Sequence, residues 1–259
     1  MSEPQTTDEL SEALDEVTVP AEPKLLVTDI EARGLSVGPG ADLSGEDLSY
    51  AQMGWRNLKG ADLSGCTALK SVLTRAILAG ANLSNGVFTD SDMYGARFQG
   101  CRAEHTVFDN CVLNQALFED SVMVGASFKG TTLEDCEFMN ADLRGVSFAG
   151  AHIEFTNFSG ARMDGADFVG AMLKKVVFDT ADPDYENVDL HQAIWLDETE
   201  EPPADWMLGH DGTLRRSFEY IISRSARPDL NAEAARMLYD EHPELGERDM
   251  LILLGSLGR

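Results

Sequence analysis

A repeat of five residues runs without interruption through the middle of this 259-residue chain, from residue 41 to residue 180. Its third position is large and apolar in 26 of 28 repeats, and the exceptions are Ala68 and Ala103. The position two residues earlier is small in 24 repeats, and the position two residues later is Gly, Asn or Asp in 19. A period of five fits neither the 3.6-residue turn of an α-helix nor the two-residue period of a strand. The pattern therefore predicts a solenoid built from short repeating units.

We expect a square coil in which each repeat of five residues forms one side. The large central residue points inward and fills the core, and the small residue before it also points inward, close to a corner. Gly, Asn and Asp adopt the positive φ angles of tight turns at low cost. Successive coils should stack at about 4.8 Å, the usual spacing of strands, so seven coils would form a rod of roughly 34 Å.

The consensus Ala-(Asp/Asn)-Leu-x-x resembles that of the pentapeptide-repeat proteins. It is plainest at Ala41-Asp42-Leu43, Ala61-Asp62-Leu63, Ala81-Asn82-Leu83, Ala141-Asp142-Leu143 and Ala166-Asp167-Phe168. The resemblance covers residues 41–180 and implies a right-handed quadrilateral β-helix. The expected fold class is therefore mainly β, with a β-helix of about seven coils followed by a C-terminal α-helical tail.

Phenylalanine occupies every tenth residue of the later repeats. With four sides per coil, this spacing predicts two columns of rings on opposite sides of the coil, and aromatic columns favour offset stacking. Their members are Phe88, Phe108, Phe128, Phe148 and Phe168 in one column, and Phe98, Phe118, Phe138, Phe158 and Phe178 in the other.

Four further segments flank the repeats. Residues 1–23 are acidic and hold too little apolar surface to offset the entropy of ordering, so they are expected to be disordered. Residues 24–40 are expected to cap the first coil, with a strand at Lys24–Ile30, because a solenoid otherwise exposes unpaired strand edges. Residues 181–205 form an acidic linker and end cap, in which Val188, Leu190, Ile194 and Trp195 could cover the last coil. Residues 206–259 carry amphipathic patterns at 213–227, 231–242 and 244–257 that predict helices.

No motif for catalysis, metal binding or cofactor binding stands out. There is no P-loop or H-E-x-x-H pattern, and a filled coil offers no concave pocket. Cys66, Cys101, Cys111 and Cys136 all fall at the small inward position, so their spacing follows the repeat and predicts buried free thiols. We therefore expect a protein that is not an enzyme, with no catalytic residues, no metal and no cofactor.

The net charge of −25 is divided unevenly along the chain. The repeats of residues 41–180 contribute only −7, and most of the acids lie in the two ends. Direct nucleic-acid binding is unfavourable at this charge. The sequence has no run of 18 apolar residues and no apolar signal segment near its start, so we expect no membrane span and a cytoplasmic location, with secretion by a signal-less route as the alternative.

Several apolar side chains fall at outward positions of the repeat. Val107, Val112, Leu117 and Val122 follow one another around a single coil, and the outward aromatic residues are Tyr50, Trp55, Tyr94 and Phe155. One reading is simple β-propensity together with docking of the chain's own ends. The other is a protein-binding patch, because clustered exposed apolar groups often mark one.

The last predicted helix is apolar nearly all round, which implies that it is buried in something. Its candidate binding residues are Met250, Leu251, Leu254 and Leu257. The family resemblance implies a homodimer through a hydrophobic terminal helix, although this tail is longer than a simple cap.

Two functions remain open from the sequence. In the first, the rod is a rigid scaffold that binds another protein through its outer faces, and the C-terminal helices provide oligomerisation or partner specificity. In the second, it resembles the pentapeptide-repeat DNA mimics that bind DNA gyrase and confer resistance to gyrase inhibitors. Duplex DNA carries roughly 20 charges over 34 Å, whereas the repeats net only −7, and this comparison favours the scaffold.

Overall fold

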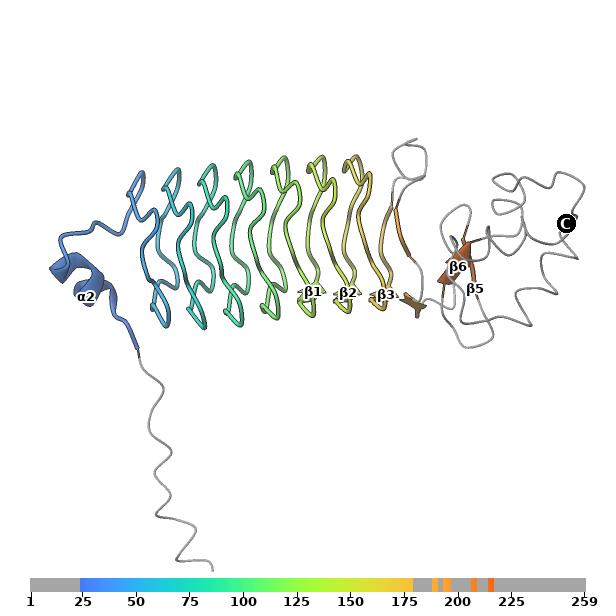
Figure 1. Cartoon of the computed structure of the whole chain (residues 1–259), viewed down its shortest axis with the longest axis horizontal. Coiled ribbons are helices and arrows are strands. Elements are labelled where there is room, and N and C mark those ends of the chain that lie inside the picture. The colour runs from blue at the N-terminus through green and yellow to red at the C-terminus, as the bar shows by residue number, and fades with distance from the viewer. Residues whose placement is uncertain (1–23, 179–187, 191–192, 197–205, 209–213, 217–259) are drawn as a thin grey trace, which may run out of the picture.

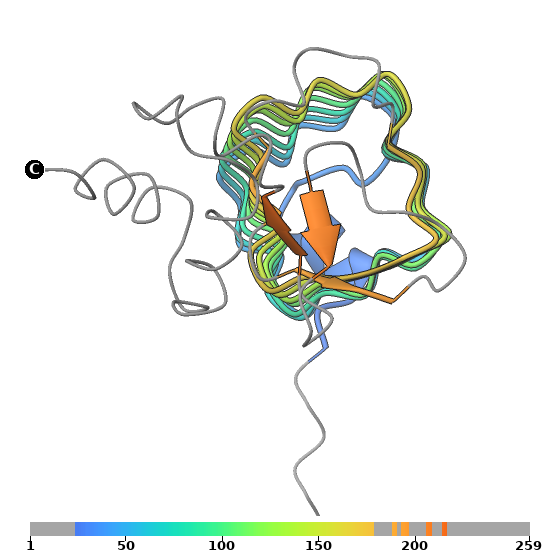
Figure 2. The ribbon, with the colours of Figure 1, turned by 90° about the vertical axis from the view of Figure 1, so that its right-hand side faces the viewer.

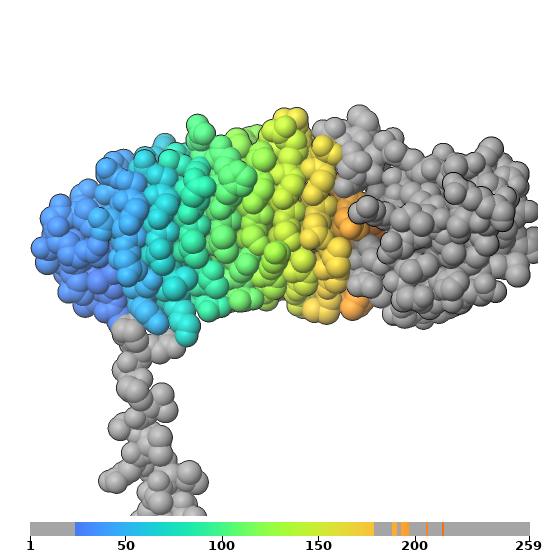
Figure 3. All heavy atoms as spheres, in the orientation of Figure 1, coloured from blue at the N-terminus to red at the C-terminus, as the bar shows by residue number. Residues whose placement is uncertain are grey.

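The computed structural model describes residues 24–178, 188–190, 193–196, 206–208 and 214–216. Residues 41–178 form a rod of stacked coils, mainly β in character, with parallel pairing between one coil and the next (Figure 1). Seen along the rod, the coils superimpose into a four-sided outline (Figure 2). Side chains fill the spaces between the ribbons, so that the surface facing the viewer in Figure 3 is a continuous rod.

Each paired residue meets the residue at the same position four repeats later, which confirms the predicted register. Asp42 pairs with Asp62, Asp62 with Asn82 and Asn82 with Arg102, and each of the other three sides has an equivalent series. We call residues 41–45 and the repeats stacked on them the first side. The second, third and fourth sides begin likewise with residues 46–50, 51–55 and 56–60.

The burial of each repeat follows the expected order. The small first residue is buried, and the large third residue is buried in every repeat before Phe178, which is half-buried. The second residue is half-buried or exposed, and the last two lie in the turn. The fifth residue has a φ between 50° and 71° in every repeat from Gly45 to Lys175. This conformation was expected for Gly, Asn and Asp, but Trp55 and Phe155 adopt it too. The stacked backbone therefore imposes the turn even where the side chain disfavours it.

The two predicted columns of phenylalanine rings form the centre of the core. Phe108 and Phe128 stack with their ring centroids 4.9 Å apart, and Phe98 and Phe118 stack at 4.6 Å. The columns also touch each other edge to face, as between Phe118 and Phe128 at 5.8 Å. Rings from opposite sides thus meet across the coil and leave no lumen between them.

The third side changes its conformation along the rod. Its early repeats contain only single bridges and turns, whereas its later repeats form three short strands, β1 (Thr132–Glu134), β2 (His152–Glu154) and β3 (Met172–Lys174). A fourth strand, β4 (Ile194–Trp195), pairs with β3 in parallel, and the sheet order is β1-β2-β3-β4.

The N-terminal cap differs from the predicted strand. Leu25 makes one parallel bridge with Ala51, and the chain then forms the helix α2 (Val27–Ala32). Val27 and Ile30 are the buried residues of this helix, and the backbone N–H of Leu26 donates to Asp29 Oδ2 at its first turn. The apolar residues of this segment follow helical spacing because only one face meets the end of the coil.

The coil continues beyond residue 180, after an insertion that shifts the register by two positions. Asp189 pairs with Asp167, and Ile194 pairs with Met172, where an uninterrupted repeat would have paired residues 187 and 192. Leu190 and Trp195 then occupy central positions and are buried, which agrees with the prediction that this segment covers the last coil.

The prediction that the C-terminal tail begins as helix is wrong for the residues that the structure describes there. Residues Trp206–Leu208 (β5) and Leu214–Arg216 (β6) form an antiparallel pair in place of helix. The backbone N–H of Leu214 donates to the carbonyl of Ala193 at 2.7 Å, and the Leu214 side chain is fully buried. Unpaired backbone groups at the coil end favour extended chain here, and this requirement overrides the helical pattern. The rest of the tail, residues 217–259, lies outside the described residues.

Candidate protein-binding face

The four apolar residues predicted as a binding patch lie on four different sides of the rod. Val122, Val107, Val112 and Leu117 belong to the first, second, third and fourth sides, respectively. Val112 and Val122 are 42% and 36% exposed, whereas Val107 and Leu117 are half-buried between their neighbours in the stack. They therefore form a belt around one coil, and no single partner surface would meet all of them. Met250, Leu251, Leu254 and Leu257 lie outside the described residues.

Outward-facing aromatic residues gather on the third side. Trp55, Tyr94 and Phe155 all belong to it, whereas Tyr50 lies on the second side. Trp55 is 68% exposed and Phe155 is 43% exposed, and the exposed Val112 lies on the same side between them along the rod. This side thus combines three aromatic residues and one aliphatic residue on a single face.

Arg75 is held between two of these aromatic rings. Its guanidinium carbon lies 4.8 Å from the centroid of Trp55 and 5.8 Å from that of Tyr94. The Tyr94 hydroxyl donates to Gln115 Oε1 at 2.7 Å, which extends the row by one more coil. A Cβ at Gly95 would lie 3.2 Å from Arg75 Cγ, so the glycine leaves room for the arginine stem.

A second cluster of cations and an aromatic ring lies at the other end of the same side. The ammonium groups of Lys174 and Lys175 lie 5.8 Å and 5.3 Å from the centroid of Phe155. Cation–π contacts of this kind contribute roughly 0.5–1 kcal/mol at exposed sites. They fix the orientation of side chains that would otherwise be mobile on the surface.

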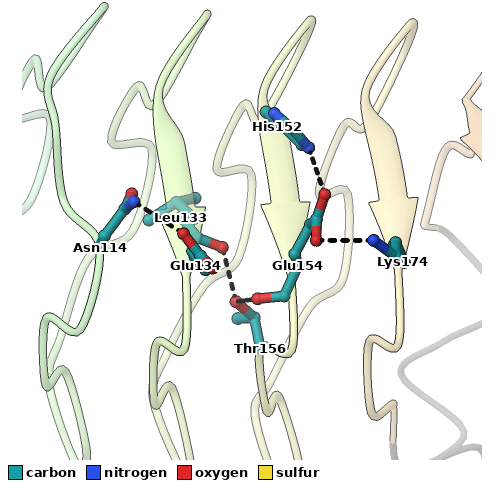
Figure 4. Close-up of polar contacts among 7 residues, drawn as sticks. All are labelled: Asn114, Leu133, Glu134, His152, Glu154, Thr156 and Lys174. Carbon is teal, nitrogen blue, oxygen red and sulfur yellow. Dashed lines mark hydrogen bonds and ion pairs between the residues drawn. The ribbon is translucent and has the colours of Figure 1, made fainter.

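A hollow of about 130 Å³ lies between these two clusters, where the third side changes from turn to strand. Its lining residues are Asn114, Thr132, Leu133, Glu134, His152 and Glu154. Figure 4 shows the polar contacts around it, across β1, β2 and β3. Pockets for small molecules usually measure roughly 300 Å³ or more, so this hollow is suited to a single side chain of a partner.

Several polar groups of the hollow are paired with each other, whereas Asn114 Oδ1 is buried and has no hydrogen-bond partner among the described residues. His152 Nε2 lies 2.8 Å from Glu154 Oε1, and Lys174 Nζ lies 3.1 Å from Glu154 Oε2 (Figure 4). The hydrogen bond from His152 and then that from Lys174 hold the pKa of Glu154 below its ordinary value. Asn114 Nδ2 donates to Glu134 Oε2 at 3.1 Å. These contacts form a network of ion pairs and hydrogen bonds that contains no activated nucleophile.

The described residues contain no group of three or more His, Cys, Asp or Glu that could hold a metal ion. Their four cysteines are free and buried, and burial raises the pKa of each thiol to about 12. A thiol in this state is a poor nucleophile, because the thiolate is the reactive form.

Acids and bases are mixed along the first side of the rod. The paired positions of the first side are, in order along the rod, Asp42, Asp62, Asn82, Arg102, Val122, Asp142 and Arg162. Arg144 and Arg162 both contact Asp142, and the hydrogen bond from Arg144 is the main cause of the lowered pKa of this carboxyl. The longest acidic run of this column is therefore two residues.

Sequence reasoning missed the aromatic face, although the signal was present. Trp55 and Phe155 are separated by a whole number of coils, so the numbering alone places them on one side. No helix among the described residues is long and apolar enough to cross a bilayer.

Comparison with known proteins supports the repeat assignment. Residues 71–145 match a family model described as a pentapeptide repeat region. Residues 128–172 match a second family model, which is described as pentapeptide repeats in nine copies. A search of curated proteins gives no match.

Several solved structures are similar in part. A pentapeptide repeat protein, Rfr23, from the cyanobacterium Cyanothece 51142 is 18% identical, with a TM-score of 0.33, and the match covers 38% of this chain and 64% of Rfr23. QnrB1, a plasmid-mediated fluoroquinolone resistance protein, is 22% identical, with a TM-score of 0.42. The match covers 57% of this chain and 73% of QnrB1. HetL is a pentapeptide repeat protein involved in heterocyst differentiation regulation from the cyanobacterium Nostoc sp. strain PCC 7120. It is 19% identical, with a TM-score of 0.34, and the match covers 61% of this chain and 86% of HetL.

Proposed function

This chain belongs to the pentapeptide-repeat family, and we propose that it is a non-enzymatic scaffold that binds another protein through the third side of its β-helix. In this proposal the rod is a right-handed quadrilateral β-helix of about seven coils. Residues 206–259 provide oligomerisation or partner specificity, through Met250, Leu251, Leu254 and Leu257.

The observation that carries this proposal is the row of outward-facing aromatic and cationic side chains on one side. Tyr, Trp and Arg are the residue types that most often dominate binding energy at protein interfaces. Here Trp55, Arg75 and Tyr94 are already ordered by mutual contact, which lowers the entropy cost of binding. The small hollow beside Glu134 and Glu154 would accept one protruding side chain of the partner.

A matched set of variants tests the face. Trp55→Gly combined with Phe155→Gly removes two aromatic groups of the third side, and both sites have the positive φ that glycine tolerates. Tyr50→Gly is the control, because Tyr50 has the same turn conformation on the second side.

Proteins captured from lysate of the producing cells should be quantified for each variant by mass spectrometry. We expect the double variant to lose specific partners that the wild-type chain and Tyr50→Gly both retain, with unchanged circular dichroism. Equal capture by all three proteins would exclude the third side as the binding face.

The alternative function is DNA mimicry at gyrase, with resistance to gyrase inhibitors. A mimic needs a nearly continuous acidic stripe, since duplex DNA carries one charge per about 1.7 Å. On the first side, the row of acids is interrupted by Arg102, Arg144 and Arg162. This interruption supports the scaffold function instead. A supercoiling assay with gyrase and its inhibitors distinguishes the two, because a mimic would inhibit or protect the enzyme at micromolar concentration and a scaffold for other partners would do neither.

A further inference from the structure

A basic patch lies at the N-terminal end of the rod, although the whole protein is strongly acidic. It consists of Arg56, Lys59, Arg75 and Arg97, which are all exposed on the adjoining third and fourth sides of the first three coils. The same two sides of these coils carry a single acid, Asp92, whose Oδ1 accepts the backbone N–H of Tyr94. On a chain with a net charge of −25, four cations beside one acid are a strong local departure from the average.

The four cations have no carboxylate partner among the described residues. None of them takes part in an ion pair there, whereas Arg33, Arg102, Arg144 and Arg162 are each paired with a nearby acid. Lys129 and Lys175 also take part in no ion pair among the described residues, but each is a single cation or lies beside one other, whereas this patch gathers four cations beside one acid. This concentration of charge favours an anionic ligand that lies outside the described residues.

Arg75 is the best-ordered member of the patch. Its guanidinium carbon lies over the rings of both Trp55 and Tyr94. An arginine held on aromatic rings can still bind a carboxylate through two parallel hydrogen bonds from its N–H groups. Trp55 would at the same time offer apolar surface to the chain that carries the carboxylate.

We propose that the acidic segment of residues 1–23 of the same chain docks on this basic patch. The segment has seven acids and no lysine or arginine, and its acids are Glu3, Asp8, Glu9, Glu12, Asp15, Glu16 and Glu22. Its charge is therefore complementary to that of the patch, and an acidic polypeptide meets the need for several carboxylates in one ligand.

The attachment point of the segment lies beside the patch. The backbone N–H of Leu25 donates to the carbonyl of Tyr50 at 3.1 Å, and its carbonyl accepts from Gln52 at 2.9 Å. The segment thus joins the rod at the repeat that contains Trp55. A chain of this length spans up to about 75 Å when extended, far more than the roughly 15 Å of three coils.

Other acidic ligands are less favourable. The acidic stretch of residues 182–205 follows β3 in the sequence, and β3 lies at the opposite end of the rod from the patch (Figure 1). Nucleic acid is repelled by the net charge of the protein. Tethering raises the effective concentration of residues 1–23 at the patch to the millimolar range, which an untethered partner must exceed. This inference stands independently of which partner binds the third side.

Zero-length cross-linking of the full-length chain with a carbodiimide tests the proposal. The reagent joins Lys59 Nζ to a carboxylate that lies in contact with it, and mass spectrometry identifies the joined peptides. We expect cross-links from Lys59 to acids of residues 1–23, and their loss in 1 M NaCl, where the screening length falls to about 3 Å. Lys129, which is exposed on the second side, is the control and should not join this segment.

The variant Arg75→Gln should reduce the yield of the Lys59 cross-link, while acetylation shows that Lys59 itself stays reactive. Mixing isotopically labelled and unlabelled chains separates docking within one chain from docking between two copies. Absence of the cross-link at low salt, equal yields at Lys59 and Lys129, cross-links from Lys59 to residues 182–205 only, or exclusively intermolecular products would each overturn the proposal.

Discussion

The fifth residue of each repeat shows how strongly the stack controls the backbone. Fourteen residues other than glycine adopt a positive φ there, among them Trp55, His105 and Phe155. At the corners from Gly45 to Phe155 the backbone N–H donates to the next coil, as from His105 to the carbonyl of Val124 at 3.0 Å. The hydrogen bonds of the stack offset the local strain, so exposed aromatic residues can be presented at corners.

Glycine at these corners should contribute to stability through its φ alone. Gly100 has a φ of +63° and free space around a Cβ, so Gly100→Ala should lower the free energy of unfolding by about 1 kcal/mol. Gly38 also has space for a Cβ but no positive φ, and Gly38→Ala should be neutral or slightly stabilising. Urea denaturation followed by circular dichroism measures both, and equal effects would contradict this explanation.

The buried cysteines predict a loss of stability at alkaline pH. Burial raises the pKa of Cys66, Cys101, Cys111 and Cys136 to about 12 in the folded state, above the ordinary value of the unfolded chain. A raised pKa stabilises the fold below the unfolded pKa, and this stabilisation is lost as pH rises from there towards the folded value. The free energy of unfolding should therefore decrease above about pH 9.

The Cys→Ala variant of all four sites is the matched control for that measurement. It should show a weaker alkaline decrease than the wild-type chain. The same thiols should react with iodoacetamide in urea but not in the native protein. Fast alkylation of the native protein at neutral pH would show that the thiols are accessible.

At the scale of elements, the two ring columns form one connected core. Phe128 illustrates this arrangement, because it stacks on Phe108 and Phe148 and meets the edges of Phe118 and Phe138. A single coil of four repeats has no internal sheet or helix, so its shape depends on these contacts and on pairing with its neighbours. Damage to one layer should therefore affect the coils on both sides.

The variant Phe128→Ala should lower the free energy of unfolding by about 3–5 kcal/mol, because it leaves a cavity in the middle of the columns. The same change at Phe155, which is 43% exposed, removes only surface contacts and should cost about 1 kcal/mol or less. Chemical denaturation of both variants measures the difference. Similar losses would show that the ring columns do not determine stability.

At the scale of the whole molecule, both ends of the rod are covered. At one end α2 buries Val27 and Ile30, and at the other the β5–β6 pair buries Trp206 and Leu214 (Figure 1). An uncovered coil would expose unpaired backbone groups that can pair with another chain. The covered ends direct interactions to the sides of the rod.

Opening the C-terminal end should cause self-association. Leu214→Asp places a charge in a fully buried position against Ala193 and should displace β6 from the last coil. We expect oligomers in size-exclusion chromatography with light scattering. Leu196→Asp is the control at the same end, because Leu196 is 42% exposed, and it should leave the oligomeric state unchanged.

The repeat by itself determined the coil, its four sides, the inward residues and the stacked rings. It could do so because the period relates each residue to its neighbour one coil later, and because buried positions tolerate only apolar or small side chains. The register of Phe108 and Phe128, or of Cys111, follows from counting alone.

The tertiary structure decided what happens where the period ends or where side chains meet on the surface. Apolar patterns that fit helix and strand alike occur at Lys24–Ile30, Trp206–Leu208 and Leu214–Arg216, and contact with the coil ends selects between the two structures. The row of Trp55, Arg75 and Tyr94 likewise depends on how long side chains lie across neighbouring coils. Counting places such residues on one side, but only packing in three dimensions determines which of them touch.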